Sequence, residues 1–240
     1  MNEENSCSKT LLPGVSVICS TNRTGFMEQV FANYLRQIYL PREFIIVLNN
    51  NSMDLEKWRA KAAPYVDIRV HQLDEDISLG ECLNFAIEQA NFDYIANMSD
   101  DDYYASPYLE RAMDAFTYTD ADVVGKGSLF VYFEASKILA TLLPDRENRY
   151  VQAAAGATLV FKKEVFGRVR FPDVNLGEDT VFVRKCVEKG IKIYANDRFN
   201  FVYLRRPNPD DHTWKVTDDA LIQSCEVVSQ TDDYITPITR

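Results

Sequence analysis

The first hundred residues alternate between short apolar runs and segments with the periodicity of helices. Short strand-like segments lie at residues 15–20, an apolar β-branched run, at 43–51, which ends in a polar turn, and at 66–70 and 94–98. Between them, apolar residues recur at the three- and four-residue spacing of amphipathic helices, over 26–40, 53–63 and 79–90. Strands that alternate with helices form βαβ units, which need a parallel sheet and right-handed crossovers. The sequence therefore predicts an α/β fold with a mostly parallel central sheet.

The second half of the chain has a less regular order. We expect a helix from the N-cap Ser106 and first-turn Pro107 to Tyr118. A second helix is expected over 180–189, ended by Gly190. Strands are expected over 122–134 with a turn at Gly125–Gly127, and over 157–161, 191–194 and 199–204.

These patterns predict one domain over residues 13–215. Its halves are 13–105, which has the pattern of a nucleotide-binding fold, and 106–215, which is mixed. Residues 1–12 are expected as a flexible tail and 216–240 as a C-terminal helix or tail. The end of the sequence leaves open whether the chain is cut from a longer protein.

Composition and charge restrict the classes of partner. The formal net charge is −10, so a basic surface that binds the phosphates of a nucleic acid is not expected. No apolar run reaches the length of about 18 residues that a membrane span needs, and the polar N-terminus does not resemble a secretory signal. We therefore expect a soluble, cytoplasmic protein. Peripheral contact with a membrane and the oligomeric state are left open.

Cysteine and histidine usage restricts the possible metal sites. The five cysteines are widely spaced with no C-x-x-C pair, and only two histidines are present. This pattern argues against a disulfide framework and a zinc site. Any bound cation is expected to be hard and held by oxygen, as Mg²⁺ and Mn²⁺ are.

The most informative local cluster is Asp100–Asp102, which directly follows the apolar run 94–98. The carboxyl end of a strand is where open α/β sheets bind their ligands. Adjacent carboxylates repel one another, and a divalent cation that also binds phosphate would relieve this repulsion. The alternative interpretation is a solvated acidic loop before the next helix.

Three further groups of polar residues could belong to the same site. Ser20–Arg23 and Asn49–Asn50 follow the first two strands, although each could be ordinary turn chemistry. Glu178 and Asp179 open a helix, where they could complement its dipole or accept a proton from a substrate. A third group lies near the C-terminus. Arg205 and Arg206 offer positive charge for a diphosphate, and His212 and Trp214 offer an imidazole and a flat aromatic face for a sugar.

Four stretches in this order resemble the family 2 glycosyltransferases of the GT-A fold. VSVICSTNR resembles the opening strand and nucleotide loop of that family, and FIIVLNNNSMD its second strand. SLGECLNFAIEQANFDYIANMSDDD resembles the stretch that leads into the DXD motif, and the segment around LGEDTVFVRKC its acceptor half. The likeness covers about residues 14–214. It implies a Rossmann-like, mostly parallel central sheet flanked by helices, with a mixed acceptor-side half.

The resemblance implies a metal-dependent, inverting transfer of a sugar from a nucleoside-diphosphate sugar to a hydroxyl group. The donor would be a UDP-sugar in the first instance, with Mn²⁺ or Mg²⁺ as cofactor. The acceptor would be a glycan, a lipid-linked sugar or another cell-surface or spore polymer. A weaker likeness is to glycosyltransferases of spore-coat maturation.

The resemblance also assigns roles to individual residues. Asp179 would be the catalytic base, with Glu178 beside it. The metal would be bound by Asp101, Asp102 and His212. The donor would be contacted by Ser20, Thr21, Asn22, Arg23, Asn49, Asn50, Asp100 and Asp102.

Some residues depart from the family pattern and keep two alternatives open. Asn49 and Asn50 stand where an Asp commonly contacts the base of the nucleotide, and Ser99 replaces a common first Asp of the DXD stretch. A non-catalytic nucleotide-sugar-binding module is therefore one alternative. A nucleotidyltransferase is another, although the loop at 20–25 contains only Gly25 and lacks the lysine that such enzymes need.

Overall fold

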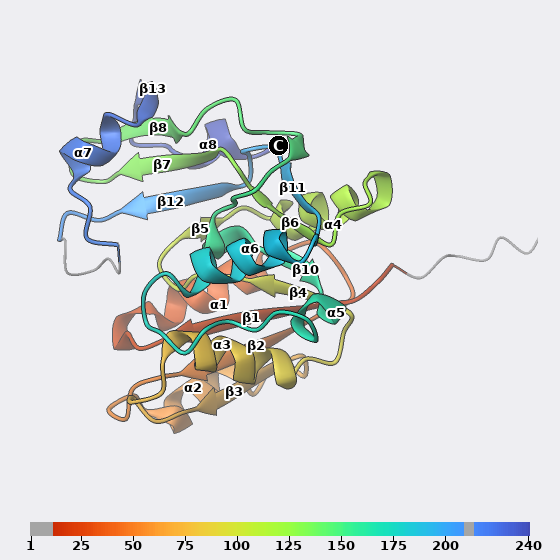
Figure 1. The fold of residues 1–240 in the computed structure, drawn as a ribbon. Helices are drawn as coiled ribbons and strands as arrows, with labels where there is room; N and C mark the ends of the chain where they lie inside the picture. The colour runs from red at the N-terminus through yellow and green to blue at the C-terminus, as the bar shows by residue number, and fades with distance from the viewer. Residues whose placement is uncertain (1–11, 209–213) are drawn as a thin grey trace, which may run out of the picture.

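The computed structural model describes residues 12–208 and 214–240, which form two β-sheets with helices packed around them (Figure 1). In this part of the chain the larger sheet, sheet A, has the strand order β3-β2-β1-β4-β10-β6-β11-β9. Its strands are β1 Val15–Thr21, β2 Arg42–Leu48, β3 Ile68–Gln72, β4 Tyr94–Asn97, β6 Val123–Lys126, β9 Arg149–Tyr150, β10 Val160–Lys162 and β11 Ile193–Asn196. Strands β1 to β4 are parallel, and β10 is antiparallel to both of its neighbours.

The smaller sheet, sheet B, has the order β13-β8-β7-β12-β5. Its strands are β5 Tyr103–Tyr104, β7 Leu129–Phe133, β8 Ile138–Leu142, β12 Phe201–Arg205 and β13 Cys225–Gln230. Strands β7 and β12 pair in parallel and the other pairs are antiparallel. The second half of the chain therefore contributes to both sheets, which agrees with the mixed half expected from the sequence.

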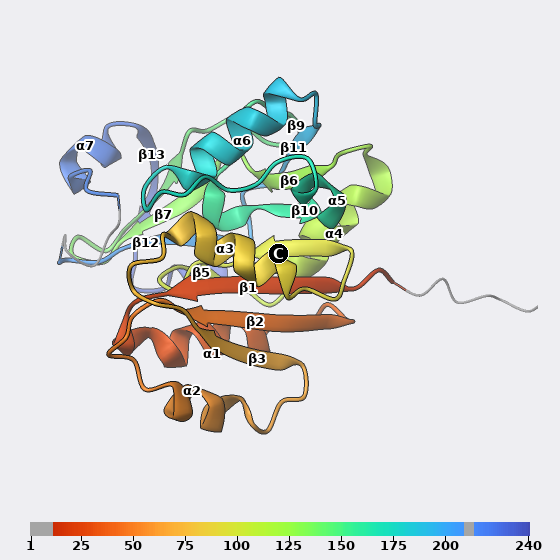
Figure 2. The ribbon, with the colours of Figure 1, turned by 60° about the horizontal axis from the view of Figure 1, so that its bottom comes forward.

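Helices cover both faces of sheet A because its central strands are apolar on both sides. Along β1, Val17 joins one buried cluster with α1, α2 and α4, and Ile18 joins another with α3, α5 and α6. These helices are α1 Met27–Leu35, α2 Leu55–Ala62, α3 Leu79–Glu88, α4 Tyr108–Tyr118, α5 Lys163–Phe166 and α6 Glu178–Glu188. Figure 2 shows α3 and α6 on the same side of sheet A. None of the helices in the described residues has the length and apolarity that a membrane crossing needs.

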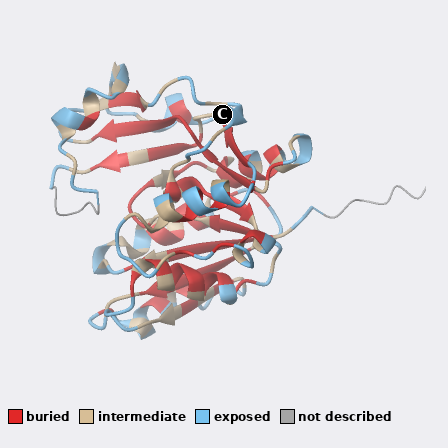
Figure 3. Ribbon diagram, in the orientation of Figure 1, coloured by how far each residue is buried: buried red, intermediate tan, exposed pale blue. Residues whose placement is uncertain are grey.

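One buried cluster connects the two sheets. It contains Val17 and Phe44 of sheet A, Val131 and Phe133 of sheet B, and Leu109 of α4 between them. Apart from the exposed strands β9 and β13, the strands of both sheets are largely buried (Figure 3). The two halves of the chain therefore share a core.

Most elements expected in the first half are present, but the helix expected over 26–40 ends at Leu35. A 3₁₀ turn, η1 Thr24–Phe26, precedes it. The helix ends early because Gln37 N–H bonds to Tyr34 O in a tighter turn, and Tyr39 then packs into the core with its hydroxyl donating to Pro13 O. Tertiary contacts of Tyr39 thus outweigh the local helical pattern.

Three expectations for the middle of the chain are corrected. Gly125 and Lys126 lie within β6 and do not form a turn, because β6 and β7 belong to different sheets. Gly127 is required for close packing, since a Cβ there would lie 2.3 Å from Arg146 O. Helix α4 begins at Tyr108, so Ser106 is not its N-cap. The strand expected at 157–161 starts as a 3₁₀ turn, η2 Gly156–Thr158, before β10.

The C-terminal segment is neither the helix nor the tail expected for 216–240. It forms a short helix, α7 Asp218–Ile222, then the edge strand β13, and a last helix, α8 Ile235–Ile238. Pairing of β13 with β8 satisfies the backbone groups of an exposed segment that has no clear strand pattern. Of the expected flexible tail, residues 1–11 lie outside the described part of the chain.

Candidate functional site

A cavity of about 850 Å³ opens at the carboxyl edge of sheet A, between this edge, the start of α6 and one face of sheet B. The loops after β1, β2 and β4 form its polar wall, with Thr21, Asn49 and the aspartates of 100–102 among the lining residues. Glu178 and Asp179 line it from the first turn of α6. Parallel strands place the loops after their carboxyl ends side by side, which explains why these separated segments meet.

Helix α1 holds the acidic loop in place with two polar side chains, of which Asn33 is buried and Gln29 is half-buried. Gln29 Nε2 and Asn33 Nδ2 both donate to the backbone oxygen of Asp102, at 2.8 Å each. Asn33 Oδ1 also accepts from Tyr104 N–H, and the Tyr104 hydroxyl accepts from Ser99 N–H. Because Asn33 and Tyr104 are buried and need partners within the protein, these contacts fix the backbone of the loop that carries the aspartates.

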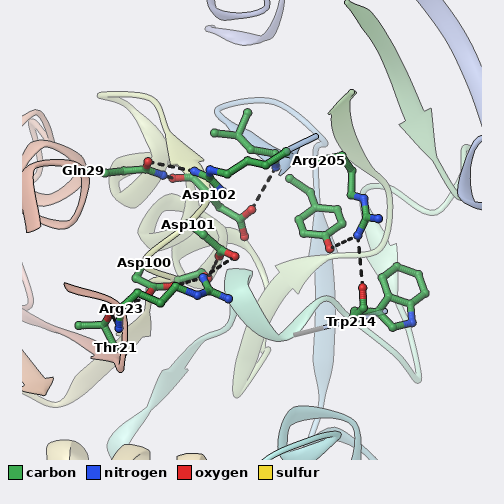
Figure 4. Close-up of polar contacts among 12 residues, drawn as sticks. Thr21, Arg23, Gln29, Asp100, Asp101, Asp102, Arg205 and Trp214 are labelled. Atoms are coloured by element: carbon green, nitrogen blue, oxygen red, sulfur yellow. Dashed lines mark hydrogen bonds and ion pairs between the residues drawn. The ribbon is translucent and has the colours of Figure 1, made fainter. Parts of the chain in front are cut away.

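The three aspartate side chains point to different partners (Figure 4). Asp100 accepts from Thr21 Oγ1 at 2.6 Å, and Asp101 accepts from Ser99 Oγ at 2.5 Å. Asp102 turns towards sheet B and accepts from Leu204 N–H. One guanidinium nitrogen, Arg23 Nη1, lies 2.9 Å from Asp100 Oδ1 and 2.7 Å from Asp101 Oδ2.

The acidic loop is almost entirely removed from water. Asp100 and Asp101 are each 7% exposed and Asp102 is 2% exposed. Burial, followed by the charge of Asp101, raises the pKa of Asp100 and of Asp102 above the usual carboxyl range. The cluster therefore favours any additional positive charge that enters the cavity.

A second pair of carboxyl groups lies across the cavity. Gly177 begins α6 with a φ of 77°, and Glu178 and Asp179 follow in the first turn. Burial and the neighbouring Asp179 raise the pKa of Glu178 to about 7. Asp179 packs so closely against Gly156 that a Cβ on Gly156 would lie 2.0 Å from Asp179 Oδ2. This glycine leaves room for the Asp179 carboxylate at the cavity wall.

The wall formed by sheet B is largely apolar and aromatic. Leu129, Phe201 and Tyr203 line it, together with Trp214, which is 49% exposed. The rings of Tyr203 and Trp214 stack with centroids 6.5 Å apart. Arg205, 3% exposed, holds this segment by donating to Trp214 O (Figure 4) and also to Val216 O and Asp218. The cavity thus has a charged end and an aromatic end.

The structure brings most of the expected site residues to this one cavity. Those that line it are Ser20, Thr21, Asn22, Arg23, Asn49, Asp100, Asp101, Asp102, Glu178, Asp179 and Trp214. Asn50 is not among the lining residues, because its amide donates to Asn22 O and its oxygen accepts from Ser52. Arg205, expected to supply charge to a diphosphate, instead bonds the chain after β12. His212 lies outside the described residues.

Several residues that shape the site carried little signal in the sequence. Gly156 has no motif around it, and Tyr203 reads as an ordinary strand residue. Asn33 and Gln37 carried a usable signal, since both interrupt, at a spacing of four, the apolar pattern of the helix expected over 26–40. The structure buries both side chains, although α1 ends before Gln37. A buried polar residue at such a position needs a partner, and here the partners are the acidic loop and the start of α4.

The acidic loop offers some of the ligands that a divalent cation needs. In the described residues, no three His, Cys, Asp or Glu side chains converge on one point. Asp100 and Asp101, however, direct one oxygen each at the same nitrogen of Arg23. Mg²⁺ is commonly held by only one or two carboxylates, with phosphates and waters completing the shell. Two converging hard oxygens in a nucleotide-sized cavity therefore fit such a cation, provided that Arg23 moves away.

Comparisons with known proteins agree on a family and a fold. The model of the family described as glycosyl transferase family 2 matches residues 16–149, more than half of the chain. A comparison with curated protein sequences gives no significant match.

The fold resembles solved structures at low sequence identity. S. aureus TarS 1-349 in complex with UDP-GlcNAc superposes with a TM-score of 0.66 at 14% identity, over 88% of this chain and 64% of that chain. The mannosyltransferase PcManGT from Pyrobaculum calidifontis, in complex with GDP-Man and Mn²⁺, superposes with a TM-score of 0.60 at 18% identity, over 81% of this chain and 57% of that chain. These likenesses confirm the expected GT-A fold. The chain corresponds to about three fifths of the length of these structures.

Proposed function

The chain belongs to glycosyl transferase family 2, and on this basis we propose that it transfers a sugar from a nucleoside-diphosphate sugar to a hydroxyl group of an acceptor. The observation that carries the proposal is that one cavity is lined both by the acidic loop at 100–102 and by Asp179. A transferase of this kind needs positive charge near the diphosphate and a proton acceptor near the attacking hydroxyl.

The polar end of the cavity is the proposed donor site. Thr21, Asn22, Arg23 and Asn49 offer hydrogen-bond donors and acceptors next to the acidic loop. Structures similar in fold bind UDP-GlcNAc and GDP-Man, which supports a nucleoside-diphosphate sugar as the class of donor. A UDP-sugar is the first candidate.

We propose Mn²⁺ or Mg²⁺ as the cofactor, held by Asp101 together with Asp100 or Asp102. The bound cation would stabilise the negative charge that develops on the diphosphate as it leaves. His212, a further candidate ligand from the sequence, belongs to the part of the chain that the structure does not describe.

Asp179 is the proposed base that accepts the proton of the acceptor hydroxyl. The anomeric carbon of the sugar would become oxocarbenium-like as the hydroxyl attacks from the face opposite the diphosphate. One direct displacement inverts the configuration at that carbon. The pKa of the neighbouring Glu178 is raised to about 7, so this carboxyl group would be partly protonated near neutral pH.

The aromatic end of the cavity is the proposed acceptor site. Tyr203 and Trp214 offer flat faces, and the apolar face of a sugar ring packs against such surfaces. A glycan, free or lipid-linked, is the class of acceptor that this wall favours.

The test is a donor and acceptor screen with purified protein. Release of nucleoside diphosphate from UDP- and GDP-sugars would be measured with Mn²⁺, with and without glycan acceptors. Asp179→Asn should lower transfer by about 10²- to 10⁴-fold, because the proton acceptor is lost. Donor binding measured by calorimetry should stay close to the wild-type value.

Asp173→Asn, at an exposed position of the loop before α6, is the matched control and should transfer at the wild-type rate. Transfer at the wild-type rate by Asp179→Asn would refute the assignment of the base. Donor binding by the wild-type protein without any transfer or hydrolysis would favour a non-catalytic binding module.

A further inference from the structure

Arg23 occupies the place in which a cation would bind to the acidic loop. Its Nη1 atom contacts Asp100 Oδ1 and Asp101 Oδ2 at 2.9 and 2.7 Å, as drawn in Figure 4. The arginine side chain is 20% exposed, and the two carboxylate side chains are about 10% exposed. The ion pair is therefore shielded from water, which strengthens the attraction between its charges.

A divalent cation and this guanidinium exclude one another. A Mg²⁺ ion held by the two oxygens that face Arg23 Nη1 would have to lie within roughly 2.0–2.1 Å of them, in space that the guanidinium now fills. Two positive charges so close together in a poorly solvated cavity would also repel each other strongly. The arginine must leave the two carboxylates before they can bind the metal.

The diphosphate of the donor is the natural second partner for Arg23. Arginine binds phosphate oxygens through paired hydrogen bonds, and Arg23 already lines the cavity. Its guanidinium also packs over the ring of Phe26, with Cζ 5.3 Å from the ring centroid.

We propose that Arg23 is an exchangeable counter-cation: it neutralises Asp100 and Asp101 in the absence of donor, and it moves to the donor diphosphate when a divalent cation takes its place. This inference rests on the proposed function. It implies that metal and nucleoside diphosphate bind cooperatively, since each removes an obstacle to the other. Metal alone must displace Arg23 without supplying the diphosphate to which it would move, so metal alone should bind more weakly than metal together with the nucleotide.

The test is the affinity of the empty site for metal alone. Calorimetric titration with Mn²⁺, without nucleotide, would compare wild-type protein with Arg23→Gln. Removal of the competing cation should tighten Mn²⁺ binding by roughly tenfold or more, which is the scale of a charge-assisted hydrogen bond. The same variant should bind UDP or GDP more weakly than wild type when EDTA is present.

Two controls separate this exchange from general effects of charge or folding. Arg206→Gln removes a guanidinium that packs on the same Phe26 ring and donates to Gln29, but not to the two carboxylates. It should change the Mn²⁺ affinity less than Arg23→Gln does. Arg23→Lys, which keeps the charge, should bind Mn²⁺ alone less tightly than Arg23→Gln. Thermal melts of each variant would establish that it folds.

The two proposals fail separately. Unchanged or weaker Mn²⁺ binding by folded Arg23→Gln would overturn the exchange. Tighter Mn²⁺ binding by Arg23→Lys than by Arg23→Gln would also overturn it. If the wild-type protein binds neither UDP nor GDP with Mn²⁺ present, the proposed function itself is wrong. If it binds one of them and the Mn²⁺ affinity of Arg23→Gln does not rise, only the exchange is refuted.

Discussion

Single residues in this site work under tight steric limits, and Gly156 is the clearest case. A methyl group at this position would lie 2.0 Å from Asp179 Oδ2. Gly156→Ala should therefore displace the Asp179 carboxylate and lower the transfer rate by at least about tenfold, since even small displacements of a catalytic group are costly. Steady-state kinetics and donor calorimetry would measure this, with donor affinity largely kept.

The matched control for Gly156→Ala is Gly167→Ala. Gly167 follows α5 with an ordinary helical φ, and a Cβ there meets its nearest atom at 3.4 Å. This variant should fold and react as the wild type does. Equal activity of Gly156→Ala and wild type would contradict the role given to Asp179.

Glu178 gives the protein a pH dependence with a definite sign. Its pKa rises from an ordinary value of 4.5 to about 7 in the folded state, through burial and then Asp179. The folded protein binds this proton more tightly than the unfolded chain does, so the free energy of unfolding should fall as pH rises from about 4.5 to about 7. Glu178→Gln removes this loss.

Thermal melts between pH 4 and 8 would measure the effect. The stability of Glu178→Gln relative to wild type should increase through this window and level off above it. Glu188→Gln, at the exposed other end of α6, controls for the loss of one charge from the same helix. A difference between Glu178→Gln and wild type that does not vary with pH would count against the raised pKa.

At the scale of the element, the aromatic wall depends on how one strand end holds the segment that follows it. Arg205, the last residue of β12, contacts Trp214 O, Val216 O, Asp218 and the Tyr203 hydroxyl. Arg205→Met keeps much of the side-chain volume but removes every one of these bonds. It should lower the free energy of unfolding by roughly 2 kcal/mol or more, because several hydrogen bonds from a buried charged group are lost.

Chemical denaturation would measure this loss, and the emission of Trp214 should shift as its backbone anchor is removed. Arg111→Met serves as the control, because Arg111 is half exposed and its ion pair with Asp114 spans 4.0 Å. Such surface pairs contribute little to stability. Equal stability of the Arg205 and Arg111 variants would show that the anchor is unimportant.

At the scale of the whole molecule, the shared core predicts that both halves unfold together. The two tryptophans report on the two halves, because Trp58 is buried in α2 beside sheet A and Trp214 lies beside sheet B. Trp214→Phe isolates the signal of Trp58, and Trp58→Phe isolates that of Trp214. In each variant, the fluorescence midpoint in urea should coincide with the midpoint from circular dichroism, as in two-state unfolding.

The comparison within each variant removes any change in stability that the substitution itself causes. A Trp214 transition at clearly lower urea than the circular dichroism transition would mean that sheet B unfolds by itself. In that case the two halves expected from the sequence, 13–105 and 106–215, would be separate folding units.

Local patterns determined the elements of the first half and the place of the acidic loop. Strands β1 to β4 and helices α2 and α3 follow their predicted ranges within a few residues, because buried strands and amphipathic helices impose different periods on apolar residues. The position of Asp100–Asp102 after a buried strand followed from the same pattern. The place of this loop at the cavity could therefore be predicted from the sequence alone.

The tertiary structure alone decided which separated groups meet. It seats Asp179 against Gly156 and brings Arg23 onto Asp100 and Asp101, 77 and 78 positions further along the chain. It also places β13, a strand without a clear apolar alternation, at the edge of sheet B. The physical reason is that backbone pairing and desolvated ion pairs gain their energy from partners distant in sequence, whose approach no local period records.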